Sequence, residues 1–294
     1  MQPNEINFKQ ERDFGDLFNA TFAFIGAEFK RLGTAILYFA VPLLLIAAII
    51  GVFVGLRQQE AVRSIQTGAA NYNNPLEIYR DFFSIYTFLN YFIILAATNI
   101  LTCTIMGYIK LYVDKGKDNF VLSEVWKEVT RYFFPVLGAT FLSAIIISIG
   151  IIFCIIPGIY LGVSLSLFIP LIVLEGASFG DAFNRSFKLV KPKFWMTLGA
   201  LIVIIVIVYI ISMILSIPAM IMGMKPLFSS LQEGRDFNFD FGISFYIING
   251  ISSLLTYIIS SIPTVLVAFL YYSLVETYEK PSLIDKIGQI SADE

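Results

Sequence analysis

Long runs of apolar residues separated by short polar stretches dominate the chain. A helix that crosses the hydrocarbon of a bilayer needs about 20 mainly apolar residues. Five segments reach that length, a sixth is shorter, and none contains Asp, Glu, Lys or Arg. They are Gly33–Leu56, Phe82–Gly107, Phe133–Ile156, Ile159–Leu174, Phe194–Met222 and Ile243–Leu274. The pattern predicts an all-α membrane protein with six transmembrane helices.

The third and fourth segments form one apolar run that Pro157-Gly158 interrupts near its middle. A Pro-Gly dipeptide is typical of a turn. The run therefore predicts a helical hairpin with almost no loop, and the six helices then form three hairpins. One long span followed by a re-entrant segment is the alternative.

An amphipathic stretch precedes each hairpin. Phe14-Gly15-Asp16-Leu17-Phe18-Asn19 precedes the first and closely resembles Phe179-Gly180-Asp181-Ala182-Phe183-Asn184, which precedes the last. A weaker copy begins at Leu122, and Ser178 with Asp181 is typical of a capping box. Apolar residues at helical spacing beside basic ones predict helices that lie in the headgroup plane.

These copies predict a pseudo-threefold internal repeat within one polytopic membrane domain, residues 1–275. The repeat units are 10–113, 120–174 and 178–275, and residues 276–294 form a polar cytoplasmic tail. Two interpretations of the repeat fit: duplication as an economical way to build a bundle, or units that flank a central site, as in transporters.

Composition and charge agree with a lipid environment. Of the residues, 57% are hydrophobic and 14% charged, whereas a soluble domain carries about 25% charged residues. Five basic residues lie on one side of the predicted spans and the other fifteen on the opposite side. The five are Arg57, Arg63, Arg80, Lys225 and Arg235. Because basic loops stay in the cytoplasm, both termini are expected there. That the membrane is a bacterial inner membrane is what the family resemblance described below implies.

The sequence holds no recognisable catalytic, cofactor or metal site. Histidine is absent, and Cys103 and Cys154 fall near opposite faces of the predicted bilayer, so neither a metal cluster nor a disulfide is expected. No glycine-rich phosphate loop occurs. We therefore expect a non-enzymatic protein with no cofactor.

Polar residues within two spans have two interpretations. Asn90, Asn99 and Thr102 lie in the second span, and Asn249 and Thr256 lie in the sixth. They can hold helices together by hydrogen bonds, or they can line a polar path. The absence of ionisable residues from the spans argues against a proton-coupled carrier.

A cluster of charges is predicted at the cytoplasmic end of the fourth span. Glu175 can pair there with Lys110, Arg185 or Lys188. Arg185, Lys188 and Lys191 can also attract anionic lipid headgroups. Anchoring at the interface is the simpler interpretation of this cluster, and a binding site is the other.

One stretch carries a family resemblance. It comprises Pro157-Gly158-Ile159-Tyr160-Leu161, Pro170, Glu175-Gly176, Ala182, Arg185-Ser186, Leu189, Lys191 and Trp195. It resembles bacterial six-helix membrane proteins that include the membrane domain of glycerophosphoryl diester phosphodiesterases. The ending Leu283-Ile284-Asp285-Lys286-Ile287-Gly288 looks like that of Bacteroidetes members. The catalytic domain of those enzymes is absent, so the resemblance implies a membrane part of unknown function.

Two functions follow as expectations. The first is a subunit or scaffold of a membrane complex, and the alternative is a transporter or facilitator for a lipid or small amphiphile. The expected partners are membrane lipids and other membrane proteins, and nucleic acid is not expected.

Overall fold

The computed structural model describes residues 6–66, 84–233 and 241–279. Within these ranges the protein is all-helical and has no strand. Six helices or closely connected runs of helices in these ranges are long and apolar enough to cross a membrane. They are Val41–Gln66, Ile85–Lys115, Leu122–Phe153, Ile155–Leu174, Phe179–Pro226 and Ile243–Glu279. The all-α class with six long apolar segments is thus confirmed.

The chain forms two compact units. Unit 1 comprises Met1–Phe39, Asn99–Val206 and Ser261–Glu294, and unit 2 comprises Ala40–Thr98 and Ile207–Ser260. Two long helices, α4 (Ile85–Lys115) and α9 (Phe194–Glu233), contribute residues to both units. These units are drawn along different lines from the predicted repeat units, which stay a prediction.

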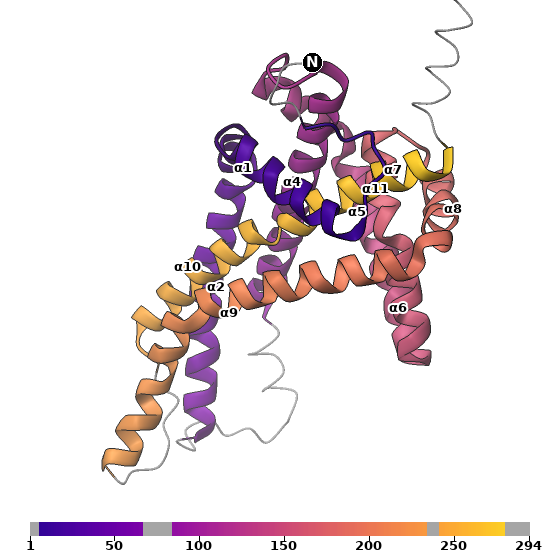
Figure 1. The fold of residues 1–294 in the computed structure, drawn as a ribbon. Helices are drawn as coiled ribbons and strands as arrows, with labels where there is room; N and C mark the ends of the chain where they lie inside the picture. The colour runs from indigo at the N-terminus through magenta and orange to yellow at the C-terminus, as the bar shows by residue number, and fades with distance from the viewer. Residues whose placement is uncertain (1–5, 67–83, 234–240, 280–294) are drawn as a thin grey trace, which may run out of the picture. The chain divides into compact units, whose positions relative to one another are not determined.

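Unit 1 contains most of the elements in Figure 1. In chain order they are α1 (Phe14–Phe39), the second half of α4, α5 (Leu122–Phe153), α6 (Ile155–Ser164), η1 (Leu165–Leu167), α7 (Phe168–Leu174), α8 (Phe179–Val190), η2 (Lys191–Lys193), the start of α9, and α11 (Ile262–Glu279). Large side chains from several of these helices are fully buried, among them Leu17, Phe24, Phe168 and Phe269. They form the core of this unit.

The N-terminal segment before α1 is part of that core. The Phe8 ring is 2% exposed and stacks on Phe269 of α11, with 4.1 Å between the ring centroids. The Arg12 N–H donates to Ser273 Oγ of α11 at 2.9 Å. The segment is therefore held by the last described helix, which lies beside it in Figure 1.

The first predicted span begins too early. Gly33 lies inside α1, which runs without a break to Phe39, and the apolar helix that follows is α2 (Val41–Gln66). The physical reason is a buried face that continues past the predicted boundary. It is formed by Leu17, Thr21, Phe24, Glu28, Leu32 and Ala35 at steps of three and four residues. The predicted interfacial helix and the start of the predicted span are thus one helix.

The turn between α5 and α6 lies at Cys154, not at Pro157-Gly158. Pro157 is instead the third residue of α6, where its missing N–H leaves no hydrogen bond unmade. Helices α5 and α6 approach each other closely at Gly150 and Gly158. A Cβ atom added to Gly150 would lie only 2.9 Å from Gly158 Cα. Gly158 therefore serves close packing and not the turn.

Unit 2 contains α2, the first half of α4, the second half of α9 and α10 (Ile243–Ile259). Helices α2 and α10 pack at Gly250, where an added Cβ would lie 3.4 Å from Val52 Cγ2. Ser252 Oγ donates to the Leu215 carbonyl at 2.9 Å and joins α10 to α9. Small residues thus bring the backbones of these helices together, as is usual in membrane bundles.

The sixth predicted span, Ile243–Leu274, is two helices. Helix α10 ends at Ile259 and α11 begins at Ile262. Pro263 is the second residue of α11. Because proline has no N–H and clashes with the preceding turn, it ends α10 and starts a new helix.

Candidate functional site

A cavity of about 190 Å³ lies within unit 2, between α2, α4 and α10. Its polar lining consists mainly of Asn90 from α4 and of Asn249, Ser253 and Tyr257 from α10. The last three share one face of α10, since they are four residues apart. Their spacing therefore directs a row of uncharged polar groups at one opening.

The two asparagines of the cavity are in different states. Asn90 is buried, lies over Gly51, and its Nδ2 donates to the Ala47 carbonyl at 2.7 Å. Asn249 is exposed, and its amide has no hydrogen bond to any described residue. Asn90 thus joins α4 to α2, whereas the Asn249 amide is available to a ligand.

An apolar groove adjoins the cavity. It is lined by Leu45 and Ile49 of α2 and by Ile247, Ile251 and Leu254 of α10. The groove and the cavity share three small or short residues as a wall: Ala48, Val52 and Gly250. The exposed fractions of Ile49 and Ile251 are 69% and 57%.

The lining of both hollows contains no Asp, Glu, Lys or Arg. Uncharged hydrogen-bonding groups beside aliphatic side chains are the usual lining of a pocket for a small apolar molecule with a polar end. The arrangement offers hydrogen bonds to a neutral polar head and a channel for an aliphatic chain. It offers no nucleophile activated by a base.

The five predicted polar residues do not line one cavity. Of the five, Asn90 and Asn249 line the cavity of unit 2, and Thr256 lies on α10 outside that lining. Asn99 and Thr102 belong to the part of α4 in unit 1. Asn99 is buried beside α5, and with its amide turned to satisfy both atoms it donates to the Phe133 carbonyl and accepts from the Leu137 N–H. Its contacts are those of helix packing.

The predicted charge cluster forms in unit 1. Glu175 follows α7 and accepts hydrogen bonds from Arg185 and from the Tyr271 hydroxyl. The other terminal nitrogen of Arg185 donates to Glu279 at 2.6 and 2.8 Å. The cluster therefore links α7, α8 and α11.

The other basic residues predicted near Glu175 lie elsewhere. Lys110 pairs with Glu128 at 3.1 Å and donates to the Tyr132 hydroxyl at 2.8 Å. Lys188 and Lys191 are exposed and have no ion pair with a described residue. Near them Trp195 is 80% exposed. A tryptophan beside free lysines is the composition of a membrane interface.

Unit 1 contains two buried charged residues, Glu28 and Arg12, whose burial the sequence did not predict. Glu28 is 1% exposed, accepts from the Tyr108 hydroxyl at 2.6 Å, and lies 3.4 Å from Lys117 Nζ. Glu28 lies four residues from both Phe24 and Leu32, so helical spacing alone could have placed it on the buried face of α1.

The Arg12 guanidinium donates to the carbonyls of three residues, Asn7, Phe8 and Gln10. Burial lowers the pKa of Arg12, against the opposing effect of Asp16.

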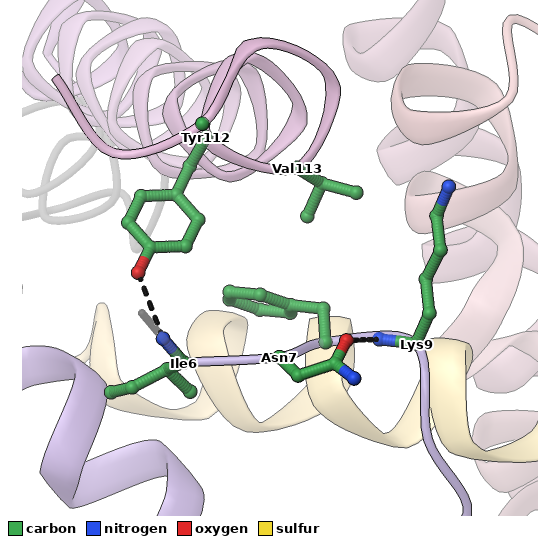
Figure 2. A pocket seen from close by; sticks show the side chains of 7 residues that line it. Ile6, Asn7, Lys9, Tyr112 and Val113 are labelled. Atoms are coloured by element: carbon green, nitrogen blue, oxygen red, sulfur yellow. Dashed lines mark hydrogen bonds between the residues drawn. The ribbon is translucent and has the colours of Figure 1, made fainter. Parts of the chain in front are cut away.

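A second cavity, of about 250 Å³, lies in unit 1 beside the N-terminal segment (Figure 2). The Ile6 N–H donates to the Tyr112 hydroxyl at 3.1 Å, and the Lys9 N–H donates to Asn7 Oδ1 at 3.0 Å. Ile6, which lines this cavity, is the first residue of the described ranges. We assign it no site.

The fold and the two hollows define a helical protein with six segments long enough to cross a membrane and a mixed polar and apolar site. The chain belongs to the family described as a domain of unknown function, DUF7847, whose model matches residues 82–279. No curated protein and no solved structure matches the chain significantly. The resemblance to the phosphodiesterase membrane domains stays a prediction.

Proposed function

We propose that this protein is a non-enzymatic integral protein of the bacterial inner membrane that handles a lipid or small amphiphile. The observation that supports this most is the polar cavity of unit 2 that shares a wall with an apolar groove. An amphiphile has a polar end, which matches the cavity, and an apolar chain, which matches the groove.

The uncharged lining favours a neutral polar end, such as a hydroxyl or an ester carbonyl. A charged headgroup would lose hydration there without gaining an ion pair, which is costly. The cavity, at about 190 Å³, is several times the roughly 30 Å³ that one water occupies in the liquid. A small head therefore fits, and its chain lies between Ile49 and Ile251.

The proposed membrane arrangement follows the apolar segments and the basic residues. Both termini lie in the cytoplasm, in accord with the fifteen basic residues on that side. The three hairpins and their amphipathic helices belong to the same proposal. Helix α8 supports it, because it is short, ends at exposed lysines and is capped by Ser178, whose Oγ accepts from the Asp181 N–H.

The second candidate is the subunit or scaffold of a membrane complex. It draws on the apolar side chains that α9 exposes, among them Ile205, Tyr209 and Ile210. Either a partner helix or lipid can cover such a face, so this observation favours the scaffold less strongly than the two hollows favour amphiphile handling.

The test is binding of dioleoylglycerol to the purified full chain in detergent, followed by native mass spectrometry. Asn249→Leu removes the free amide from the cavity, and we expect about tenfold weaker binding, the equivalent of roughly one hydrogen bond. Gly250→Leu fills the shared wall and should abolish binding. Gly26→Leu is the matched control, because Gly26 is exposed on α1 and an added Cβ would touch nothing within 4 Å.

Unchanged binding in both site variants, together with reproducible recovery of another membrane protein, would favour the scaffold. Asn249→Leu is the variant least liable to misfold, since its side chain is exposed. Gly250→Leu is interpreted only where its thermal unfolding matches that of the control.

A further inference from the structure

The tip of the α5–α6 hairpin consists entirely of apolar and sulfur-containing residues. Its sequence is Ile151-Ile152-Phe153-Cys154-Ile155-Ile156. These side chains are exposed within the described structure, with 82% of Ile152, 84% of Phe153 and 75% of Ile156 accessible. A turn that emerges into water normally carries polar residues. This tip has the composition of a buried surface, yet no described residue covers it.

The tip lies far from any charge along the chain. No Asp, Glu, Lys or Arg occurs between Arg131 and Glu175. The 22 residues from Tyr132 to Phe153 measure about 33 Å at a helical rise of about 1.5 Å per residue. The return from Ile155 to Leu174 has 20 residues. Both legs match the roughly 30 Å of hydrocarbon in a bilayer, so the tip reaches the far edge of the hydrocarbon.

Part of the backbone at the turn is hydrogen-bonded internally. The Cys154 N–H donates to the Gly150 carbonyl at 3.0 Å, and the Gly158 N–H donates to the Cys154 carbonyl at 3.3 Å. Pro157 has no N–H to satisfy. These two hydrogen bonds and the proline lower the number of donors that hydrocarbon would leave unpaired at this turn.

The exposed tip continues a stripe along α5. Phe141, Ile145 and Ile149 are exposed on one face of that helix, and Ile152 follows at the next helical step. At the tip the exposed side chains come from both helices of the hairpin. The exposed apolar surface runs along α5 and surrounds the tip of the hairpin. Fluid acyl chains can cover such a surface on all sides, whereas a partner protein would cover only one side.

We propose that the α5–α6 tip, Ile151–Ile156, ends among the acyl chains of the far leaflet and contacts lipid directly. The hairpin then crosses the hydrocarbon without presenting a loop to the outer solution. This inference goes beyond the amphiphile site and rests only on the proposed insertion of the chain in a membrane.

The chain carries its own probe at the tip. Cys154 is exposed there, whereas Cys103 is buried. The purified full chain is reconstituted in phosphatidylcholine liposomes and treated with a charged maleimide that cannot cross bilayers, before and after freeze–thaw loading of the reagent. We expect labelling of Cys154 in both cases to be at least about tenfold slower than labelling of a thiol at an exposed polar position of the same chain, because hydrocarbon excludes the reagent.

Two variants calibrate the labelling. Cys154→Ser should abolish it in detergent, which shows that Cys103 does not react. Gln10→Cys in the Cys154→Ser background places a thiol at an exposed position outside the apolar segments, and it should react fully once the reagent is on both sides. Flotation of the liposomes after an alkaline wash tests membrane insertion separately.

A second measurement locates the tip by depth. Bimane attached to Cys154 should be quenched by lipids brominated along their acyl chains and not by iodide in the water. Reaction of Cys154 with the charged maleimide in liposomes at the rate of Gln10→Cys would overturn the proposal. Quenching by iodide as strong as that of bimane at Gln10→Cys would do so as well.

Discussion

The buried charge of Arg12 is stabilised by hydrogen bonds to backbone carbonyls of its own segment. Its guanidinium donates to carbonyls of residues two to five positions earlier, and its ring neighbour is Phe269, 4.9 Å from the guanidinium carbon to the ring centroid. A guanidinium has enough donors in a planar fork to hold several carbonyls at once. Arg12 therefore shapes the N-terminal segment around itself.

Arg12→Met keeps much of the apolar stem and removes the donors. We expect the free energy of unfolding of unit 1 to fall by about 2–3 kcal/mol, because buried carbonyls lose their partners. Thermal unfolding in detergent measures the change. Lys9→Met is the control, since the Lys9 side chain is exposed, and a loss of the same size there would contradict this role of Arg12.

Glu28 makes a second residue-scale prediction. Glu28→Gln keeps an oxygen that can accept from the Tyr108 hydroxyl but loses the charge that faces Lys117. Glu28→Leu loses both. We expect Glu28→Leu to destabilise the protein by about 3 kcal/mol and Glu28→Gln by clearly less. Equal losses in thermal unfolding would show that the hydrogen bond from Tyr108 contributes little.

Helix packing at the α5–α6 hairpin depends on glycine at the point of close approach. A Cβ atom on Gly158 would lie 2.8 Å from the Ile151 backbone nitrogen and 3.0 Å from its Cα. Backbone atoms cannot rotate away, so the legs of the hairpin must separate. We expect Gly158→Ala to destabilise the hairpin by about 1–3 kcal/mol.

The matched control for that change is Gly33→Ala. Gly33 is also helical, but an added Cβ there would meet nothing within 4 Å. We expect it to stabilise α1 by up to about 1 kcal/mol, the difference in helix propensity between glycine and alanine. Thermal unfolding of the two variants should therefore shift in opposite directions, and a shared direction would contradict the role of Gly158.

At the level of elements, long apolar segments are predictable and their ends are less so. Length and hydropathy identify six segments because lipid imposes a simple requirement on them. The ends depend on packing. Gly33 suggests a boundary, but the buried face of α1 continues past it, and Pro157 suggests a turn, but the close approach at Gly158 moves the turn to Cys154.

The candidate site is only half predictable. Asn90 and Asn249 stand out as polar residues in apolar runs, and they do line one cavity. Asn99 stands out equally but binds the α5 backbone. The groove cannot be read from the sequence, because Ile49 and Ile251 look like any other lipid-facing residue. The role of each asparagine depends on which helices pack against it, and the sequence alone does not give that packing.

For the whole molecule, the proposed orientation has a direct test. Fusions of alkaline phosphatase and of green fluorescent protein after residue 294 report opposite sides of the inner membrane. We expect fluorescence without phosphatase activity, since basic residues keep their flanks in the cytoplasm. A fusion of phosphatase after residue 70, in the predicted external loop, should be active. Phosphatase activity at the C-terminal fusion would overturn the orientation.

The binding of the N-terminal segment by α11 sets an order of events during synthesis. Phe8 stacks on Phe269 and the Arg12 N–H donates to Ser273, so these contacts cannot form until the ribosome has made α11. At about 5–20 residues per second, that interval is on the order of tens of seconds. Throughout it, the Phe8 ring and the Arg12 guanidinium lack their contacts with Phe269. The segment from Phe8 to Arg12 is thus made well before the helix that holds it, and a chain stalled before α11 would display this segment undocked to chaperones and proteases.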